Sequence, residues 1–368
     1  MRAELNLTDV VPNFKFAGQF IRAEPYEFGH IHDTFYTYFS KSDGLVHRYI
    51  LQRINQYVFK CPEELMANIE AISVHLQRKI TTAGGDPERE SLTLVPTLEN
   101  GGFLHRNGGD YWRAYISIEG AQTYMVPQSI DHVYNAGRAY GRFQQQLDDF
   151  PVHRLHETIP DFHNTVKRFK TFVEVVEEDK HNRAQDVKEE IDFVLQRAGE
   201  TSIVVDLIDR RELPLRVTHN DTKYNNVMID DETGEGVCVI DLDTVMPGSS
   251  LYDFGDAIRS ITNTGEEDEQ DLSKVHFNLE CFEKYTQGYL DATRDALTPA
   301  EIQLLAFSAR LMSCECGMRF LTDHLNGDVY FKIHKPGHNL DRCRTQFKLV
   351  RDMERDQEEM LDIVQKYC

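Results

Sequence analysis

The residues of this sequence whose types and spacing are best suited to chemistry lie between positions 216 and 243. Asp221 opens the set, Asn226 follows five residues later, and Asp241 ends an apolar run further on. Apolar residues on both sides of a turn-forming segment predict a β-hairpin with strands at 227–229 and 237–240 and a turn at 230–234. A hairpin brings the loop before its first strand close to the end of its second strand. We therefore expect Asp221, Asn226 and Asp241 to converge.

These residue types suit phosphoryl transfer. A carboxylate such as Asp221 can orient a hydroxyl and accept its proton, while Asn226 and Asp241 offer the hard oxygen ligands that Mg²⁺ prefers. Lys223 follows Asp221 by two residues, where a cation can reach the transferring phosphate. An acidic surface hairpin would explain each residue singly, but the joint spacing is typical of protein-kinase-like phosphotransferases.

A second motif nearby could be mistaken for the metal site. Asp253-Phe254-Gly255 spells the metal motif of protein kinases, but it lies beyond a Pro-Gly turn and outside the hairpin. We therefore assign the metal to Asp241 and keep Asp243 as a second candidate, since alternate residues of a strand share a face. Asp253 and Asp256 are expected to brace the loop or to cap the following helix.

Composition excludes several other functions. The chain has 368 residues, of which 40% are hydrophobic and 27% charged, as is usual for a globular protein. Its net charge of −21 argues against nucleic acid as a partner. No apolar run is long enough to span a membrane, and seven irregularly spaced cysteines indicate reduced thiols. We expect a cytoplasmic protein without a membrane partner, as a monomer or weak oligomer.

The first third of the chain reads as mainly β. Strands are predicted at 21–26, 27–33, 34–39 and 47–52, and a turn at Gly29 could cover a phosphate, although an ordinary β-turn explains it equally well. Apolar residues at helical spacing predict a helix over 62–76, on which Glu70 could form the ion pair of a kinase-type helix. The expected cationic position holds Gln52, with Arg53 beside it. An alternating strand points these two side chains to opposite faces, and the sequence leaves open which of them faces the nucleotide.

Glu119-Gly120 separates two kinds of sequence. Further strands are predicted before it, at 92–95 and 111–118, and helices after it. We predict an α+β protein with a small β-rich lobe, residues 1–119, and a larger mainly helical lobe, residues 120–368. The backbone near Ile116 and Ile118 would then hydrogen-bond adenine. Helices are expected at 133–147, 277–292, 299–324 and 342–367, and within 161–196.

Motifs along most of the chain carry a family resemblance. They include Gly29-His30-Ile31, Tyr49-Ile-Leu-Gln52, Met246-Pro-Gly248, Glu315-Cys-Gly-Met-Arg-Phe320 and Gly327-Asp-Val-Tyr-Phe331, besides the hairpin. With these the chain resembles the N-acetylhexosamine 1-kinases of the aminoglycoside phosphotransferase and choline kinase superfamily.

The resemblance implies a bilobal kinase fold and transfer of the ATP γ-phosphate to the anomeric hydroxyl of N-acetylglucosamine or N-acetylgalactosamine. It implies Asp221 as the base, with Asn226 and Asp241 binding Mg²⁺. His30, Arg319 and Tyr330 match sugar-contacting positions of the family. Gln52 at the usual cation position also fits the resemblance.

Two other classes of function stay open at this point. Another small-molecule kinase, acting on choline, homoserine or an aminoglycoside, would share the hairpin. A choline site would need an aromatic cage, and an aminoglycoside site an acidic one. A nucleotide-binding protein without kinase activity is the non-enzymatic alternative, but Asp221, Lys223, Asn226 and Asp241 are all present, which argues against it.

Overall fold

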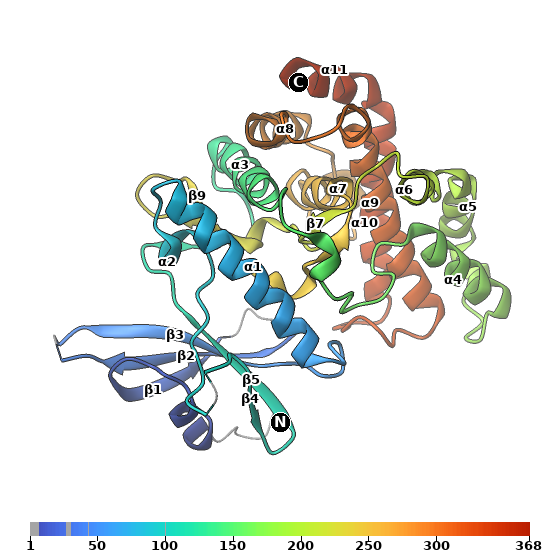
Figure 1. Ribbon diagram of the computed structural model, residues 1–368. Helices are drawn as coiled ribbons and strands as arrows, with labels where there is room; N and C mark the ends of the chain where they lie inside the picture. Colours follow the sequence, from blue (N-terminus) through green and yellow to red (C-terminus); the bar gives the residue numbers. More distant parts are fainter. Residues whose placement is uncertain (1–6, 27–30, 43, 100) are drawn as a thin grey trace.

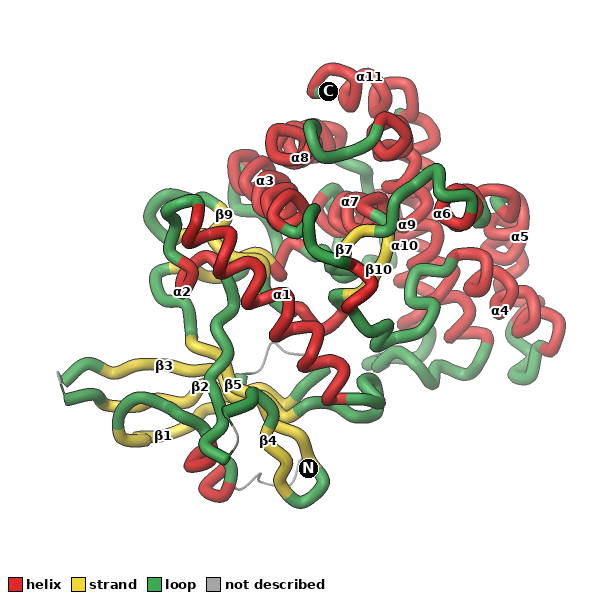
Figure 2. Tube along the Cα trace, in the orientation of Figure 1, coloured by secondary structure: helices red, strands yellow, loops and turns green. Residues whose placement is uncertain are grey.

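The structure, a computed structural model, describes residues 7–26, 31–42, 44–99 and 101–368. One antiparallel sheet forms the N-terminal part, and helices dominate the C-terminal part (Figure 1). Figure 2 shows most of the strands gathered at one end of the molecule and most of the helices at the other. The predicted α+β fold class is therefore confirmed.

The N-terminal sheet has five strands in the order β1-β2-β3-β5-β4. Their bounds are β1 Gln19–Pro25, β2 Asp33–Ser40, β3 Val46–Arg53, β4 His105–Asn107 and β5 Asp110–Ile116. Strands β3 and β5 are antiparallel neighbours, and Gln52 lies opposite Arg113. This register places the predicted cation position of β3 directly beside a buried arginine.

Two of the predicted strands, those at 92–95 and 27–33, are not confirmed by the described residues. Residues 92–95 do not form a strand, and Leu94 makes only an isolated bridge with Tyr115 at the edge of β5. The segment predicted as a strand at 27–33 falls largely outside the described residues, and β2 begins only at Asp33.

The first long helix, α1 (Pro62–Thr82), runs between the sheet and the helical part (Figure 1). It begins with Pro62, which suits a first helical turn because its missing N–H would have no partner there. The predicted apolar stripe is confirmed as core, and its residues Leu65, Ile69, Ile72 and Leu76 are all buried. The short helix α2 (Pro87–Glu90) follows.

The C-terminal part holds nine further α-helices and two small sheets among the described residues. The helices are α3 Ile130–Gln146, α4 Thr165–Glu178, α5 Lys188–Gln196, α6 Ile203–Asp209, α7 Ser250–Ile261, α8 Leu279–Thr293, α9 Pro299–Leu325, α10 His338–Arg355 and α11 Gln357–Tyr367. Strands β6 (Ala121–Gln122), β8 (Val227–Asp230) and β9 (Gly236–Val239) form one sheet, and β7 (Arg216–Thr218) pairs with β10 (Met246–Gly248).

The single helix predicted over 342–367 is in fact two helices. Helix α10 ends at Arg355 and α11 begins at Gln357, with Asp356 between them in a non-helical conformation. Both Asp356 oxygens accept hydrogen bonds from the Arg355 guanidinium. The spacing of apolar residues in this charged segment did not indicate the break at Asp356.

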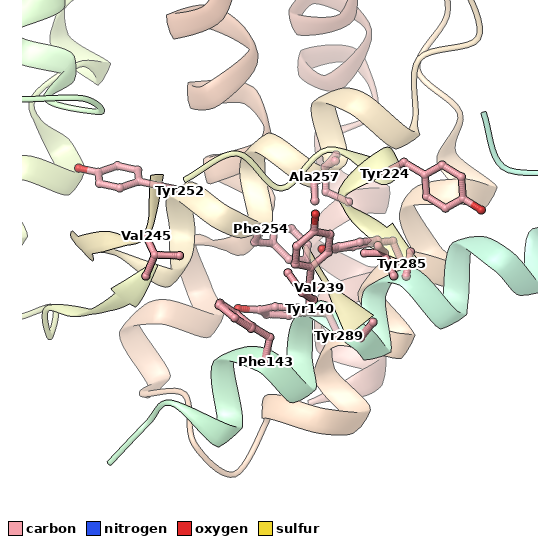
Figure 3. Close-up of a cluster of buried hydrophobic side chains, with 14 of the residues drawn as sticks. Tyr140, Phe143, Tyr224, Val239, Val245, Tyr252, Phe254, Ala257, Tyr285 and Tyr289 are labelled. Atoms are coloured by element: carbon pink, nitrogen blue, oxygen red, sulfur yellow. The ribbon is translucent and has the colours of Figure 1, made fainter. Parts of the chain in front are cut away.

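Aromatic side chains fill the centre of the helical part (Figure 3). Phe254 of α7 is fully buried, and its ring lies 5.8 Å from that of Tyr285 and 5.3 Å from that of Tyr289, both on α8. Helices α3 and α8 approach very closely, because a Cβ atom at Gly137 of α3 would lie only 2.3 Å from the carbonyl oxygen of Tyr285. The close approach is therefore possible only with glycine at this contact.

We expect Gly137→Ala to destabilise the fold by about 1–3 kcal/mol, because the added methyl group forces two helix backbones apart in a packed core. Gly199→Ala is the matched control, since a Cβ atom there meets no atom within 4 Å. Chemical denaturation of both variants measures the difference. Equal stability of the two variants would contradict the close packing of α3 on α8.

Candidate active site

The predicted hairpin is confirmed. Strands β8 and β9 pair in antiparallel register, with Val227 opposite Val239 and Met228 opposite Cys238. A short 3-10 helix, η6 (Tyr224–Asn226), leads into β8, and another, η7 (Leu242–Thr244), follows β9. The loop before the hairpin and the residues after it are thus held at the same end of the small sheet.

Hydrogen bonds bring the predicted catalytic residues together. The ammonium of Lys223 lies 2.9 Å from Asp221 Oδ1. The side-chain amide of Asn226 donates to the Asp221 carbonyl oxygen at 2.8 Å and lies 3.4 Å from Asp221 Oδ2. The backbone N–H of Ile240 donates to the Asn226 carbonyl oxygen at 2.9 Å, which places Asp241 next to this cluster.

The electrostatics around Asp241 suit a bound cation. Its backbone is left-handed at this bend, with φ of 61°. Desolvation by the surrounding protein, followed by the neighbouring charges of Asp243 and Asp221, raises the pKa of Asp241 well above its usual range. A divalent cation would relieve this repulsion between carboxylates.

The donor set also fits Mg²⁺ rather than a closed protein site. No group of three or more His, Cys, Asp or Glu side chains in the described part of the chain could hold a metal ion. Mg²⁺ usually takes only one or two protein ligands and completes its shell with water and substrate phosphates. One carboxylate and one amide, Asp241 and Asn226, match that pattern.

Asp253 braces the loop, as predicted for this residue. Its carboxylate accepts hydrogen bonds from the backbone N–H groups of His219, at 2.8 Å, and Asn220, at 2.7 Å. Burial raises its pKa to about 6 even though these two N–H groups and His219 favour the charged form. The alternative, that Asp253 or Asp256 caps the following helix, is wrong: both lie inside α7, and the Ser249 hydroxyl caps it.

Asp256 of α7 is a further carboxylate near Lys223. It forms an ion pair with Arg259 at 2.6 Å, one helical turn along α7. Burial would raise the pKa of Asp256, but the charges of Arg259 and Lys223 lower it below its usual range. Asp256 is thus a second negative neighbour of Lys223, and it helps to keep the Lys223 ammonium charged.

Asp243 adjoins Asp241 and is itself paired with two basic side chains of the chain. Both of its oxygens accept hydrogen bonds from the Arg113 guanidinium, and Oδ2 also lies 2.7 Å from His32 Nε2. Because His32 Nδ1 accepts a hydrogen bond from the backbone of Asn55, the Nε2 atom carries the proton and donates it to Asp243. Arg113 and His32 lower the pKa of Asp243 well below its usual range against the effect of burial.

Gln52 and Arg53, the two candidates for the phosphate-facing position on β3, point to opposite faces of the sheet. Gln52 accepts a hydrogen bond from Arg113 Nε at 2.9 Å, so it lies on the face that turns toward Asp243. Arg53 points the other way and forms ion pairs with Asp33 at 2.5 Å and with Asp110 at 3.1 Å. Of the two, Gln52 lies on the side of the hairpin site.

The other predicted nucleotide contacts are distributed along the sheet and α1. Glu70 is exposed on α1, and no ion pair to it is present among the described residues. The N–H of Ile116 donates to the Thr93 carbonyl oxygen at 2.9 Å, whereas the backbone of Ile118 has no hydrogen bond within the described ranges. Of the two residues, only Ile118 has a backbone N–H that no acceptor of the described residues takes up. Gly29 and His30 lie outside the described residues.

Two of the predicted acceptor residues, Arg319 and Tyr330, lie near the C-terminal end of α9. Arg319 lies on α9, and its guanidinium lies 5.2 Å from the ring centre of Phe162 and 5.6 Å from that of Phe331. Tyr330 is exposed beside it and is an electrostatic neighbour of the guanidinium. The buried carboxylate of Asp323 accepts the backbone N–H groups of residues 329–331 and so fixes the loop that carries Tyr330.

One buried histidine connects this acceptor region to the catalytic loop. His163 Nδ1 lies 2.8 Å from Glu315 Oε2 on α9, and its Nε2 lies 3.1 Å from the Asn220 carbonyl oxygen. Both partners are hydrogen-bond acceptors, so His163 donates from both nitrogens and is an imidazolium ion. Burial would lower its pKa, but Glu315 raises it above the usual range.

Sequence reasoning missed Arg113, His163, Glu315 and Asp323. All four are buried charged residues, and burial of a charge is a signal only once the tertiary structure is known. Glu315 had one sequence clue, its place four residues before Arg319 on a predicted helix, where side chains meet on one face.

The kinase-like arrangement of a five-stranded sheet joined to a helical part defines the class of protein. A model described as "Phosphotransferase enzyme family" matches residues 34–294, well over half of the chain. The chain therefore belongs to this phosphotransferase family.

Solved structures of low sequence identity share the fold. An aminoglycoside phosphotransferase from Alicyclobacillus acidocaldarius is 13% identical and covers 100% of this chain and 98% of its own, with a TM-score of 0.63. A choline kinase from Cryptosporidium parvum is 13% identical, with coverage of 98% and 92% and a TM-score of 0.56. An amicoumacin kinase is 13% identical, with coverage of 92% and 90% and a TM-score of 0.55. Among the described residues, no helix has both the length and the apolar character needed to cross a membrane.

We expect Asp253→Asn to lower stability and Asp241→Asn to abolish Mg²⁺-dependent turnover. Asp253→Asn places an amide against backbone donors and should cost about 1.5–3 kcal/mol of stability. Asp241→Asn removes a repelled carboxylate, so stability should hold or rise while Mg²⁺-dependent turnover is lost. Denaturation midpoints and turnover against Mg²⁺ concentration measure both effects. Loss of metal dependence in a stable Asp253→Asn protein would reverse the two assignments.

We expect the His163–Glu315 ion pair to stabilise the fold in one pH window. The lowered pKa of Glu315 makes its contribution present above its usual value of about 4.5. The raised pKa of His163 makes its contribution complete below about 6.5 and lost as pH rises through the folded pKa. Breaking the buried pair costs about 3–5 kcal/mol.

Glu315→Gln should therefore lower the denaturation midpoint most at about pH 5–6.5, with a smaller loss at higher pH. Arg319, Arg168 and Asp256 also act electrostatically on this pair and stay unchanged in the variant. Glu177→Gln, at an exposed position of α4, is the control and should show no such profile. A pH-independent loss in Glu315→Gln would mean that His163 is neutral.

Proposed function

We propose that the protein is an ATP-dependent kinase that transfers the γ-phosphate to the anomeric C1 hydroxyl of N-acetylhexosamines. The product would be N-acetylglucosamine or N-acetylgalactosamine 1-phosphate. The proposal joins the family membership, which supports phosphoryl transfer, to an acceptor region whose charge suits a neutral sugar.

In this proposal Asp221 is the base and Lys223 contacts the transferring phosphate. The anomeric hydroxyl is more acidic than other sugar hydroxyls, so a carboxylate can activate it. Asp221 is the group closest to Lys223, at 2.9 Å, and together they place a proton acceptor beside a cation. General-base catalysis of this kind contributes about 10²–10⁴-fold to turnover.

ATP would bind between the sheet and the hairpin. Gln52, Glu70, Gly29 and the backbone of Ile116 and Ile118 are the proposed nucleotide contacts, and within the described residues the backbone of Ile118 has no hydrogen bond. Mg²⁺ would be held by Asn226 and Asp241 and would neutralise charge between the β- and γ-phosphates. The related amicoumacin kinase was solved with AMP-PNP and Ca²⁺, which supports a nucleotide and a divalent ion at this fold.

The charge around Arg319 is the observation that favours a neutral acceptor over the alternatives. Arg319 forms no ion pair shorter than 4 Å with any carboxylate of the described chain. Its charged neighbours include Arg168, the imidazolium of His163 and the carboxylate of Glu315. A cationic acceptor such as choline or an aminoglycoside would be repelled here, whereas the hydroxyl and acetamido oxygens of a neutral sugar can accept from the guanidinium.

Arg319, Tyr330, Asp221 and His30 are the proposed sugar contacts. Glu315, an electrostatic neighbour of Arg319, is hydrogen-bonded through His163 to the Asn220 carbonyl oxygen. The residue after Asn220 is the proposed base Asp221. This path supports an acceptor site that adjoins the base.

We also propose that the lobes divide at Glu119–Gly120. Strand β6 follows directly and joins the sheet of the hairpin. Arg89 of α2 donates to the Glu119 and Gly120 carbonyl oxygens and pairs with Asp230. This guanidinium would hold the connection in a fixed conformation.

Phosphorus NMR of the product, with specificity constants for acetylated and free amino sugars, tests the proposal. We expect phosphate on C1 and a preference for the acetylated sugar, because burying the ammonium of a free hexosamine near Arg319 is unfavourable. Arg319→Ala should lower sugar use by about 10–100-fold with ATP affinity nearly unchanged.

Two control variants accompany this measurement. Arg351→Ala removes an exposed arginine of α10 that stacks on Phe193 of α5. This variant should leave sugar use unchanged. Asp221→Asn should lower turnover while ATP still binds. Phosphate on O6, or equal rates on choline or an aminoglycoside, would refute the sugar 1-kinase proposal.

A further inference from the structure

The strand position that is expected to supply a phosphate-binding cation carries no charge in this chain. Protein-kinase-like enzymes place a lysine on the third strand, held by a glutamate of the following helix. Here Gln52 stands on β3, and Glu70 of α1 is exposed without an ion pair in the described part of the chain. Neither half of that pair is therefore in place.

A buried cation lies one strand away. Arg113 of β5 is the cross-strand partner of Gln52, and its Nε donates to the Gln52 side chain at 2.9 Å. The Arg113 residue is only 2% exposed. The cation is thus held on the same face of the sheet as Gln52, next to the position where the lysine would be.

The Arg113 guanidinium is directed at the hairpin. It forms a two-pronged ion pair with Asp243, whose second partner is His32. Asp243 follows Asp241, the proposed metal ligand, by two residues, and Asp241 is itself an electrostatic neighbour of Arg113. A guanidinium has more N–H donors than Gln52 and Asp243 use, so it can bind a further anion.

We propose that Arg113 is the cation that contacts the phosphates of ATP, and that the Arg113–Asp243 ion pair takes the place of the strand–helix lysine–glutamate pair. The inference rests on the proposed ATP-dependent function. The cation has moved from β3 to β5, and its carboxylate partner has moved from α1 to the end of the hairpin. Gln52 then acts by orienting Arg113 through the hydrogen bond to its Nε.

The Arg113–Asp243 ion pair joins two distant parts of the chain. Arg113 belongs to the N-terminal sheet and Asp243 to the hairpin of the C-terminal part, so one ion pair links the strands that cover the nucleotide to the segment that carries Asp241. A planar guanidinium suits this position, because it can bind a carboxylate through two parallel hydrogen bonds and still face phosphate.

Equilibrium binding of ATP, ADP and adenosine, measured without any acceptor, tests the proposal. Arg113→Gln should weaken ATP and ADP binding by about 10–100-fold and leave adenosine binding unchanged. Adding Gln52→Lys to that variant returns a cation to β3 and should restore part of the lost affinity. Arg53→Gln is the matched control, because that arginine pairs with Asp33 and Asp110 on the opposite face.

A second variant protects the test against misfolding. Arg113→Gln combined with Asp243→Asn removes both charges of the buried pair, so neither remains without its partner, and it should show the same selective loss for ATP and ADP. A folded variant with normal ATP affinity, or with equal losses for ATP and adenosine, would overturn the proposal. Sugar phosphorylation does not enter the measurement, so failure of the N-acetylhexosamine specificity would leave the result standing.

Discussion

The site depends on one buried carboxylate. Asp253 accepts hydrogen bonds from two consecutive backbone N–H groups, those of His219 and Asn220. Asn220 has a positive φ of 64°, so the chain bends sharply where these bonds are made. The bend sends the following residue, Asp221, toward Lys223 and away from the helix beneath. Without a buried acceptor, two backbone N–H groups would lose their hydrogen bonds at the turn that aims the proposed base.

Like charges are concentrated around that turn. Asp243 and Asp221 both raise the pKa of Asp241, and the chain holds cations of two kinds beside these carboxylates. Lys223 pairs with Asp221, and buried Arg113 pairs with Asp243. Asp241 alone has no cation of the chain bound to it in the described residues. That asymmetry is why a divalent ion with phosphate ligands fits beside Asp241 and Asn226.

A second cluster of charged side chains surrounds His163 and Arg319. There Arg319 and Arg168 lie near the imidazolium of His163, which forms its ion pair with Glu315. The same His163 that carries one of these charges donates to the loop carbonyl of Asn220. Glu315 of α9 and the loop at Asn220 are therefore parts of one hydrogen-bonded unit, although they lie almost a hundred residues apart in the sequence.

The sequence by itself determined the hairpin, the convergence of Asp221 and Asn226 on its open end, the bracing role of Asp253 and the α+β class. These follow from short-range rules, because strand alternation, turn residues and helical spacing act over a few residues. It mispredicted a strand at 92–95, where the structure has only an isolated bridge at Leu94, and a continuous helix over 342–367, which is interrupted at Asp356. Only the tertiary structure placed Gln52 rather than Arg53 toward the site, paired Asp243 with Arg113 and His32, and revealed His163. Each of these depends on which distant charge a side chain meets, and a buried charge is stabilised only by a partner that the folded chain brings to it.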